Sequence, residues 1–354
     1  MKGNEAIGEA AIRAGCRYFF GYPITPQSEL PEYMARRLPA VGGVFLQAES
    51  EIAAINMVYG AAGAGARVMT SSSSPGISLK QEGISYLAGA ELPAVIVNVM
   101  RGGPGLGSIQ PGQSDYFQAT KGGGHGDYRL IVLAPASVQE IIDLTWEAFA
   151  LADQYRNPVM ILSDGMLGQM MEPVVLPTQE PPVLPKPWAT TGAVNRERNE
   201  IFSFFMQGEQ LEEHNRRLEQ KWQAMVEREK RVAEFFMEDA EIVVVAYGTT
   251  ARIARRAVRQ ARQVGIKAGL LRPISLWPFP DEAFQRAARK ARVFLSVEMS
   301  LGQMVEDVRL AVNGQVPVHF YGRVSVVPSP DEIFAMICQL ADEEVAVNGS
   351  VRSA

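Results

Sequence analysis

Hydrophobic residues in the first half of the chain alternate between short β-branched runs and longer alanine-rich stretches with a helical period. This alternation is typical of βαβ units built around a parallel sheet. The near-continuous apolar character of the short runs favours strands that are covered on both faces. The pattern predicts helices over residues 4–14, 26–37, 51–63, 76–90 and 137–152, and strands over residues 18–22, 44–48, 67–71, 94–100, 130–134 and 159–163.

A proline-rich stretch over residues 174–187 interrupts this rhythm, because it can form neither a central strand nor a helix. Residues 209–238 carry opposite charges at helical spacing, which predicts one or two long helices. A solvated connector is favoured there over a partner-binding helix. From residue 241 the βα rhythm returns, with a first buried strand, later strands over 268–271, 293–297 and 318–321, and helices over 251–263, 281–290, 303–312 and 331–343.

These patterns predict an α/β protein with two compact units. We expect a doubly wound parallel-sheet domain in residues 1–175 and a smaller α/β domain in residues 240–354. Residues 176–239 would form a proline-rich edge and a charged helical connector. A length of 354 residues with 47% hydrophobic residues agrees with two globular domains and excludes wholesale disorder.

The charge balance and the hydropathy of the chain argue against two classes of partner, nucleic acids and membranes. The 34 lysines and arginines against 39 acids give a net charge of -5, which offers no footprint for nucleic acid or for an anionic membrane. No apolar run reaches the 18 or so residues that cross a bilayer, and Glu5 lies where a signal peptide would be apolar. We therefore expect a cytoplasmic protein without membrane or nucleic-acid partners.

The scarcity of cysteine and histidine excludes several chemistries. Cys16 and Cys338 lie at opposite ends of the chain, so they cannot form a Cys-x-x-Cys zinc or iron–sulfur site. Three scattered histidines do not support a metal site or a Ser-His-Asp triad. Residues 102–107 do not fit the dinucleotide pattern, and the chain has no P-loop. We expect no metal ligands here, and any iron–sulfur cluster must belong to another polypeptide.

Glu51 stands at a predicted junction between a strand and a helix, and an apolar run comes after it. A first-turn acid that complements the helix macrodipole explains this residue without any ligand. The alternative is a partly desolvated carboxyl group that shares a proton with a bound heterocycle.

Arg101 ends the predicted strand over residues 94–100 and opens a glycine-rich loop over residues 102–126. Its guanidinium is suited to grip a substrate carboxylate at the edge of the sheet where ligands bind. A cation that only caps strand-end carbonyls is an equal alternative. Because ordering so many glycines is costly, we expect the loop to close over a ligand or to pack against a partner.

Two further polar segments come after predicted strands at the same edge. Thr25 precedes Pro26, which predicts that it is the N-cap of the helix over residues 26–37. A serine run over residues 71–74 offers free N–H groups to an anion, or it caps the next helix.

Four motifs together resemble the α subunit of the 2-oxoacid:ferredoxin oxidoreductases. They are Gly21-Tyr22-Pro23-Ile24-Thr25-Pro26, Gln47-Ala48-Glu49-Ser50-Glu51, Met100-Arg101-Gly102-Gly103-Pro104 and Leu271-Arg272-Pro273-Ile274-Ser275-Leu276-Trp277-Pro278-Phe279-Pro280. The resemblance extends over nearly the whole chain, and the combined order is specific. It implies a pyrimidine-binding domain of a thiamine diphosphate enzyme, followed by a domain like the C-terminal domain of transketolase.

The resemblance also implies roles for single residues. Glu51 would be the catalytic residue that bonds the aminopyrimidine ring nitrogen of thiamine diphosphate, with Pro23 and Ile24 beside the cofactor. Thr25 and Arg101 match positions that hold the oxo and carboxylate oxygens of the substrate, and Tyr22 lines the same pocket. The implied reaction is the coenzyme A-dependent oxidative decarboxylation of a 2-oxoacid to an acyl-CoA and CO2, with electrons passed to ferredoxin.

One departure from the family pattern implies partner chains. A thiamine enzyme holds its magnesium diphosphate with a Gly-Asp-Gly motif and a later Asn-Asn pair, and Ser163-Asp164-Gly165 lacks both the first glycine and the asparagines. The resemblance therefore implies a β subunit that carries the diphosphate-binding domain and Mg²⁺. Iron–sulfur clusters would lie on other subunits of the complex, γ and a ferredoxin-like δ.

The loop after Arg101 indicates the substrate side chain. Residues 105–113 contain no cation for a second carboxylate, whereas relatives that act on 2-oxoglutarate tend to carry a lysine there. A branched-chain acid such as 2-oxoisovalerate therefore fits better, with 2-oxoglutarate and pyruvate as alternatives. Two other functions stay open: the pyrimidine half of a non-oxidative decarboxylase, and a non-catalytic module that binds an acid or assembles subunits.

Overall fold

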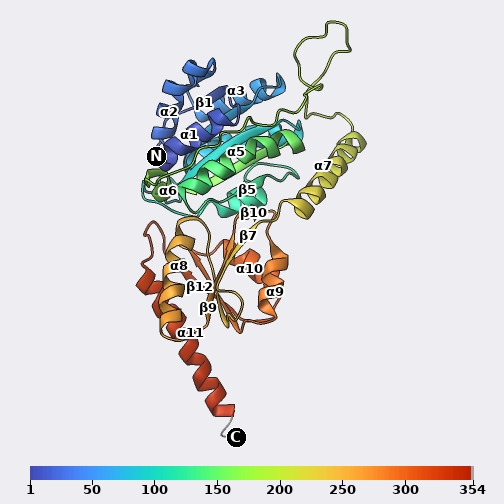
Figure 1. Cartoon of the computed structure of the whole chain (residues 1–354). Coiled ribbons are helices and arrows are strands. Elements are labelled where there is room, and N and C mark those ends of the chain that lie inside the picture. The colour runs from blue at the N-terminus through green and yellow to red at the C-terminus, as the bar shows by residue number, and fades with distance from the viewer. Residues whose placement is uncertain (352–354) are drawn as a thin grey trace.

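The computed structural model describes residues 1–351, and the side chains of residues 1–342. Two α/β units lie one above the other in Figure 1. Helices and strands of the first unit alternate along the chain as predicted. They are α1 (Gly3–Arg13), β1 (Tyr18–Gly21), α2 (Glu29–Arg37), the short η1 (Pro39–Val41), β2 (Val44–Gln47), α3 (Glu51–Gly63), β3 (Val68–Ser72), α4 (Ser74–Gly89), β4 (Ala94–Met100), η2 (Gln118–Gly122), β5 (Ile131–Leu133), α5 (Val138–Tyr155), β6 (Pro158–Asp164) and α6 (Gly165–Gln169).

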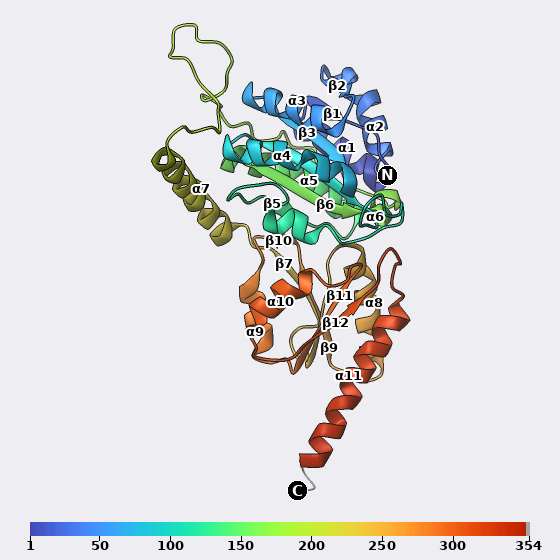
Figure 2. The same ribbon diagram turned by 180° about the vertical axis from the view of Figure 1, so that it is seen from behind.

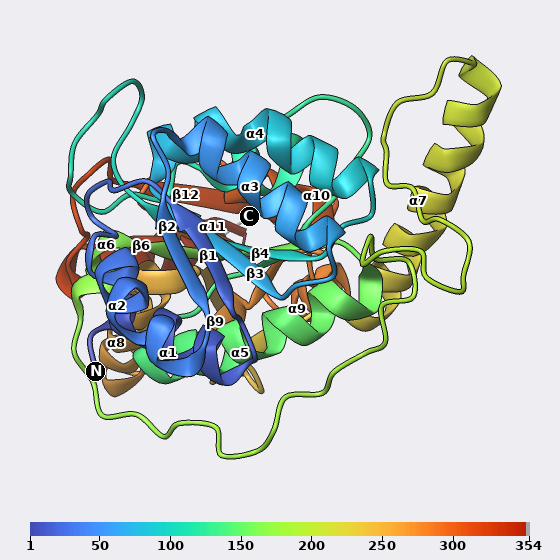
Figure 3. The ribbon, with the colours of Figure 1, turned by 90° about the horizontal axis from the view of Figure 1, so that it is seen from above.

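The first sheet has seven strands in the order β10-β5-β6-β4-β3-β1-β2, and all but β10 are parallel. Central strand β4 is buried along its whole length, as its continuous apolar character predicts. Ile96 faces the core that contains α3 and α4, whereas Val95 and Val97 face the core that contains α1, α2 and α5. Figure 3 shows these two helical layers on opposite faces of the sheet. The first unit is therefore doubly wound.

The second unit contains a sheet of five strands in the order β12-β11-β8-β9-β7. Helices α8 and α11 pack on one face, and α9 and α10 cover the other. Figure 2 shows this smaller unit below the first one. Its elements and the preceding ones are α7 (Gly208–Arg228), β7 (Val232–Phe235), β8 (Ile242–Val245), α8 (Gly248–Gln263), β9 (Ala268–Pro273), β10 (Ser275–Trp277), α9 (Asp281–Ala288), β11 (Val293–Glu298), α10 (Met304–Val312), β12 (Val318–Gly322) and α11 (Pro330–Val351).

The two units share one strand. The short strand β10 leaves the second unit and pairs antiparallel with β5, so it forms the outer edge of the first sheet. The pattern of hydrophobic residues did not predict this strand, because it has only three residues and lies inside a proline-rich motif. One hydrophobic core also extends across both units, from Ile84 of α4 to Phe284 of α9. The two units are therefore continuous in both sheet and core.

The segment between the units is extended and then helical. Residues 174–187 contain no helix or strand, as their prolines predict, and α7 is one long charged helix with an ion pair between Glu212 and Arg216. The prediction of helix up to residue 238 is wrong, since residues 232–235 form β7, antiparallel to β9. Val232 and Phe235 have a high strand propensity, and β9 supplies an edge that needs a partner.

The predicted helix from residue 26 is also wrong at its start. Helix α2 begins at Glu29, and residues 25–28 form turns, so Thr25 is not its N-cap. Pro31 explains the difference, because proline has no N–H to donate in a helix interior. In a helix that begins at Glu29, this proline falls in the first turn, where no donor is needed.

No helix within the described part of the chain is both long and apolar enough to span a membrane.

Candidate functional site

The candidate site lies at the carboxyl edge of the first sheet. Strands β4, β3, β1 and β2 are parallel neighbours, so the segments that come after them meet at one edge. Ligands of open parallel sheets bind at this edge. The segments are residues 22–25 after β1, 48–51 after β2, 73–74 after β3 and 101–105 after β4. The structure therefore brings all of the predicted site residues to the same side of the molecule.

Glu51 is the first residue of α3, whose predicted bounds are confirmed to the residue, and it is only 6% exposed. The Ser50 hydroxyl caps this helix by accepting a hydrogen bond from the Ala53 N–H at 3.2 Å, so capping does not require the Glu51 carboxylate. Among the described residues, no group forms a hydrogen bond or ion pair with that carboxylate. A buried acid without a partner is costly unless a ligand completes it. The helix macrodipole alone does not explain this burial.

Gly76 allows α4 to approach the carboxylate. A Cβ atom at this position would lie 2.7 Å from Glu51 Oε1 and 2.0 Å from Ser72 Oγ, which is closer than real Cβ atoms come. The Ser72 and Ser73 hydroxyls are buried and have no hydrogen-bond partner. Ser73 precedes α4 without capping it through its side chain, so that part of the capping interpretation is wrong. The buried Ser72 hydroxyl and the Glu51 carboxylate thus lie near each other with hydrogen-bonding capacity for a ligand.

Arg101 is 9% exposed and connects two loops of the site. Its guanidinium donates to the Thr25 carbonyl and to the Leu106 carbonyl, each at 3.0 Å. These bonds show that the residue does cap carbonyls, as the simpler interpretation predicted. Its Nε atom is buried and has no hydrogen-bond partner. One donor of this guanidinium is therefore left for a ligand.

Asp115 is a site residue that the sequence did not reveal, because it follows no strand and lies within the glycine-rich loop. Its carboxylate accepts hydrogen bonds from the Ser74 hydroxyl at 2.6 Å and from the Asn98 amide at 2.9 Å. Ser74 Oγ also accepts from the Arg101 backbone N–H at 3.0 Å. Burial raises the pKa of Asp115, and these two hydrogen bonds oppose that shift. The network fixes the chain where β4 enters the loop.

The glycine-rich loop after Arg101 packs against the second unit of the same chain. Gln113 donates its backbone N–H to the Met299 carbonyl at 2.8 Å and its side-chain amide to the Tyr247 carbonyl at 2.9 Å. Residues 118–122 form one π-helical turn, which was not predicted. A cavity of about 440 Å³ lies between this loop, the first turn of α4 and residues 300–303.

The turn after β1 carries the other predicted residues. Tyr22 and Ile24 are half-buried, whereas Pro23 and Thr25 are exposed. The buried Gln27 side chain holds the turn, because it accepts a hydrogen bond from Ser71 Oγ of β3 and donates to the Tyr22 carbonyl. The turn is thus fixed by the next strand of the sheet, and the Thr25 hydroxyl is accessible.

Lys80 is a second residue that the sequence analysis missed. It lies on α4 with none of its side chain exposed, and its ammonium donates to Thr70 Oγ1 at 2.7 Å and to the Ser71 carbonyl at 3.2 Å. Burial lowers the pKa of Lys80 to about 7, and the negative charge of Glu51 opposes that shift. A signal was present, since Lys80 occupies an apolar stripe between Ile77 and Ile84 at helical spacing.

The nearest match to a magnesium motif has a structural role in this chain. Asp164 caps α6 by accepting hydrogen bonds from the N–H groups of Met166 and Leu167, and it accepts another from the Thr249 hydroxyl at 2.8 Å. Its side chain is buried at the junction with α8. Within the described residues no group of three or more His, Cys, Asp or Glu side chains is arranged to hold a metal ion.

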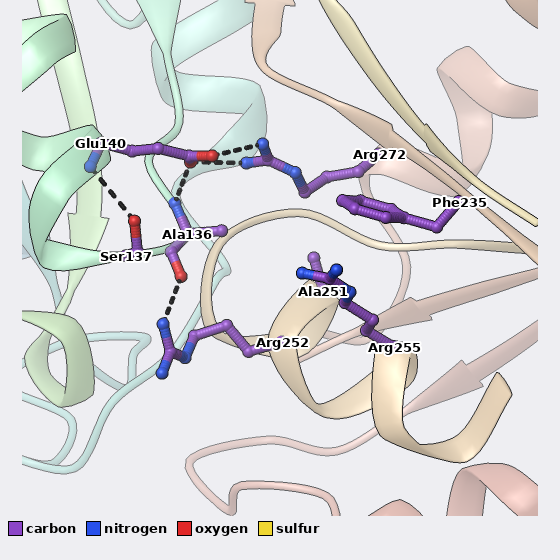
Figure 4. Close-up of a pocket in the computed structure, with 8 residues that line it drawn as sticks. All are labelled: Ala136, Ser137, Glu140, Phe235, Ala251, Arg252, Arg255 and Arg272. Carbon is purple, nitrogen blue, oxygen red and sulfur yellow. Dashed lines mark hydrogen bonds and ion pairs between the residues drawn. The ribbon is translucent and has the colours of Figure 1, made fainter. Parts of the chain in front are cut away.

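An arginine-lined pocket of about 320 Å³ lies between the two units, where α5 begins, and is shown in Figure 4. Its cations are already engaged by the protein. Arg272 pairs with Glu140 through two hydrogen bonds of 2.7 and 2.8 Å. Arg252 pairs with Glu172 at 2.7 Å, and Arg255 stacks over the Phe235 ring at 4.2 Å. These contacts connect the units, so the carboxyl edge is the better candidate for chemistry.

Comparison with known families defines the class. Residues 9–236 match the thiamine diphosphate-binding family of pyruvate flavodoxin/ferredoxin oxidoreductases, and residues 240–332 match core domain II of pyruvate:ferredoxin oxidoreductase. The chain belongs to this family of thiamine diphosphate-dependent 2-oxoacid:ferredoxin oxidoreductase subunits. The resemblance seen in the four motifs is thereby confirmed.

Individual relatives agree with this assignment. The chain is 58% identical to the ketoisovalerate oxidoreductase subunit VorB of Methanothermobacter marburgensis, over 88% of this chain and 89% of that protein. It is 38% identical to the 2-oxoglutarate synthase subunit KorA of Methanothermobacter thermautotrophicus, over 96% of this chain and 98% of that protein.

Solved structures support the fold class. The 2-oxoglutarate:ferredoxin oxidoreductase from Magnetococcus marinus, with 2-oxoglutarate, coenzyme A and succinyl-CoA bound, matches with a TM-score of 0.83 and 28% identity. That match covers 96% of this chain and 64% of that one. A split-gene transketolase matches with a TM-score of 0.61 and 15% identity, over 96% of this chain and 97% of that one, which shows a shared fold. A doubly wound domain followed by a transketolase-like domain is confirmed.

Proposed function

We propose that this chain supplies the pyrimidine-binding half of an enzyme that oxidatively decarboxylates a branched-chain 2-oxoacid to its acyl-CoA and CO2, and passes the electrons to ferredoxin. The observation that carries this proposal is the Glu51 carboxylate, which is buried and has no hydrogen-bond partner within the described residues. The unpartnered hydroxyl of Ser72 lies close by. A polar heterocycle that forms a hydrogen bond with the carboxylate is the kind of ligand that fits such a site.

Glu51 would hold the aminopyrimidine ring of thiamine diphosphate through a hydrogen bond to the ring nitrogen. When bound, this cofactor supplies the electron sink for loss of CO2 from a 2-oxoacid. The side chain's part is to share a proton with the ring nitrogen, which is general acid–base work for a carboxyl group. Pro23 and Ile24, on the fixed turn after β1, would line the ring.

Arg101, Thr25 and Tyr22 would hold the 2-oxoacid. The unpartnered Nε atom of Arg101 is available to the substrate carboxylate, and the accessible Thr25 hydroxyl can donate to an oxo or carboxylate oxygen. Because Arg101 also donates to the Thr25 carbonyl, one guanidinium sets the position of both groups. Such positioning lowers the barrier by reducing the entropy lost in the reaction.

A branched-chain substrate is supported by the loop after Arg101. Leu106 and Ile109 are exposed apolar residues on this loop, and residues 105–113 contain no cation. A second carboxylate left unpaired in a desolvated pocket would cost several kcal/mol. The higher identity to ketoisovalerate oxidoreductase subunits than to 2-oxoglutarate synthase subunits agrees with this preference.

Partner chains would complete the enzyme. A β subunit would hold the diphosphate and Mg²⁺, and γ and ferredoxin-like δ subunits would carry the iron–sulfur clusters, with coenzyme A as cosubstrate. Val44 and Leu46 on edge strand β2 and Ile52 on α3 are exposed apolar residues in the segments before and after Glu51. Exposed apolar residues close in sequence to a half-built site suit contact with the subunit that supplies the other half.

The test is purification of the chain with its native partners, followed by an assay of viologen reduction with a panel of 2-oxoacids and coenzyme A. We expect turnover that depends on thiamine diphosphate, with branched-chain acids turned over more efficiently than 2-oxoglutarate. The proposal would be wrong if the complex bound no thiamine diphosphate, or if all 2-oxoacids were inert.

A further inference from the structure

A buried lysine faces the part of α3 that carries Glu51. On α4, Gly76, Lys80 and Gly83 are spaced at i, i+4 and i+7, so they lie on one face of the helix. A Cβ at Gly76 would lie 2.7 Å from Glu51 Oε1, and a Cβ at Gly83 would lie 2.5 Å from Ile55 Cγ2. Glu51 and Ile55 are themselves one turn apart on α3. Lys80 therefore lies between the two points at which the helices touch.

The Lys80 ammonium lies in an environment of neutral groups. Its hydrogen bonds go to Thr70 Oγ1 and to the Ser71 carbonyl, and no described carboxylate forms an ion pair with it. Glu51 is the one charged group among the described residues that acts on it electrostatically. Each of the two charges would be unfavourable if buried alone, and the opposite charge of the other favours the ionised form of both.

We propose that Lys80 is a positioning residue for Glu51: its ammonium keeps the Glu51 carboxylate ionised until thiamine diphosphate binds. This inference rests on the function proposed above. The shared proton between Glu51 and the ring nitrogen then comes from solvent, so one proton is taken up and none is lost by the protein. Removal of the ammonium would remove the positive charge that favours an ionised carboxylate at position 51.

The test is a calorimetric titration of the cofactor-free complex with thiamine diphosphate and Mg²⁺ at about pH 6.5, where an ordinary carboxyl is ionised. Parallel titrations in buffers of different ionisation enthalpy give the number of protons taken up per cofactor bound. We expect the variants Lys80→Gln and Lys80→Met both to take up about one proton fewer than the native complex. Proton release from the diphosphate is common to all samples and cancels in this difference.

Two variants separate an electrostatic role from a structural one. Glutamine at position 80 keeps a neutral N–H donor without the charge, whereas methionine has no donor. If Lys80→Met alone changed the proton count, the lysine would only connect α4 to β3, and the inference would be overturned. The control is Lys221→Met, which removes a half-buried lysine paired with Glu91 far from this site and should leave the count unchanged.

Glu51→Gln distinguishes this inference from the proposed function. If glutamine at position 51 abolishes proton uptake while both Lys80 variants keep the native count, the Lys80 inference fails and the role of Glu51 stands. If Glu51→Gln leaves cofactor affinity and proton uptake at native values, the proposed function itself fails.

Discussion

The Arg101 guanidinium donates a hydrogen bond of 3.0 Å to the backbone carbonyl of Thr25. This contact joins the loop after β4 to the turn after β1, across the intervening strand β3. Arg101 therefore fixes the backbone that presents the Thr25 hydroxyl, while its own Nε atom remains without a partner. The two groups proposed to hold the substrate form one unit, and a change in either should disturb both.

Replacing Arg101 by alanine should raise KM for the 2-oxoacid roughly 10- to 150-fold. Loss of a charge-assisted hydrogen bond of about 1.5–3 kcal/mol accounts for this range. Steady-state viologen reduction by the assembled complex measures it. Arg101→Lys is the matched variant: it keeps the charge but cannot reach two carbonyls and a ligand together, so we expect partial recovery. An unaltered KM in Arg101→Ala would place the carboxylate site elsewhere.

Replacing Glu51 by glutamine should reduce decarboxylation by at least about a hundredfold, because a proton-transfer group typically contributes that much. Subunit assembly should be unaffected, since Ser50 and not Glu51 caps α3. Single-turnover release of CO2 measures the chemical step. The control is Glu49→Gln, two residues earlier and exposed, which should have native activity. Native rates in Glu51→Gln would remove the catalytic assignment.

Gly76→Ala should damage the site without removing any functional group. The new Cβ would lie 2.0 Å from Ser72 Oγ and 2.7 Å from Glu51 Oε1, so the carboxylate must move. A displacement of this size should lower kcat about 10- to 100-fold. Gly208→Ala, at the open start of α7, is the control and should be neutral. A fully active Gly76→Ala variant would mean that the exact place of Glu51 does not matter.

Burial of Lys80 should make the free energy of unfolding depend on pH in the neutral to alkaline range. Burial lowers the folded-state pKa of Lys80 to about 7, below the ordinary value of 10.5, so between these values the unfolded chain binds more protons. The free energy of unfolding should then rise with pH, by up to about 1.4 kcal/mol per pH unit. Urea unfolding of the full chain against pH measures this slope. Lys80→Met should lose that contribution, and identical slopes in both proteins would contradict the shift.

Much of the fold could be predicted from the sequence because the hydrophobic periodicity and the secondary-structure propensities of the residues agree over most elements. The helix Glu51–Gly63 and the strand Ala94–Met100 were predicted to the residue. The start of α2 was not predicted correctly. Pro31 excludes an earlier start, but this is visible only when its position within the first turn of the helix is considered. Strands β7 and β10 depend on edges supplied by residues far away in the chain, which local patterns do not encode.

The candidate site, too, could be predicted only in part from the sequence. Glu51, Thr25 and Arg101 come after strands, so sheet topology alone brings them to one edge. Asp115 joins them through hydrogen bonds made by a loop whose path could not be predicted. Lys80 was overlooked because lysine is usually solvated, although its place on an apolar stripe of α4 was visible. Long-range contacts, and not residue type, define the roles of Asp115 and Lys80.

The position of β10 limits how this protein can be rearranged. A fragment that ends before residue 240 would leave β5 as an open edge, ready to pair with another chain. Chimeras that exchange the second unit between homologues would also exchange a strand of the first sheet. A workable chimera must therefore take residues 275–277 from the same homologue as β5. Sheet pairing, and not position in the sequence, decides where the exchange can be made.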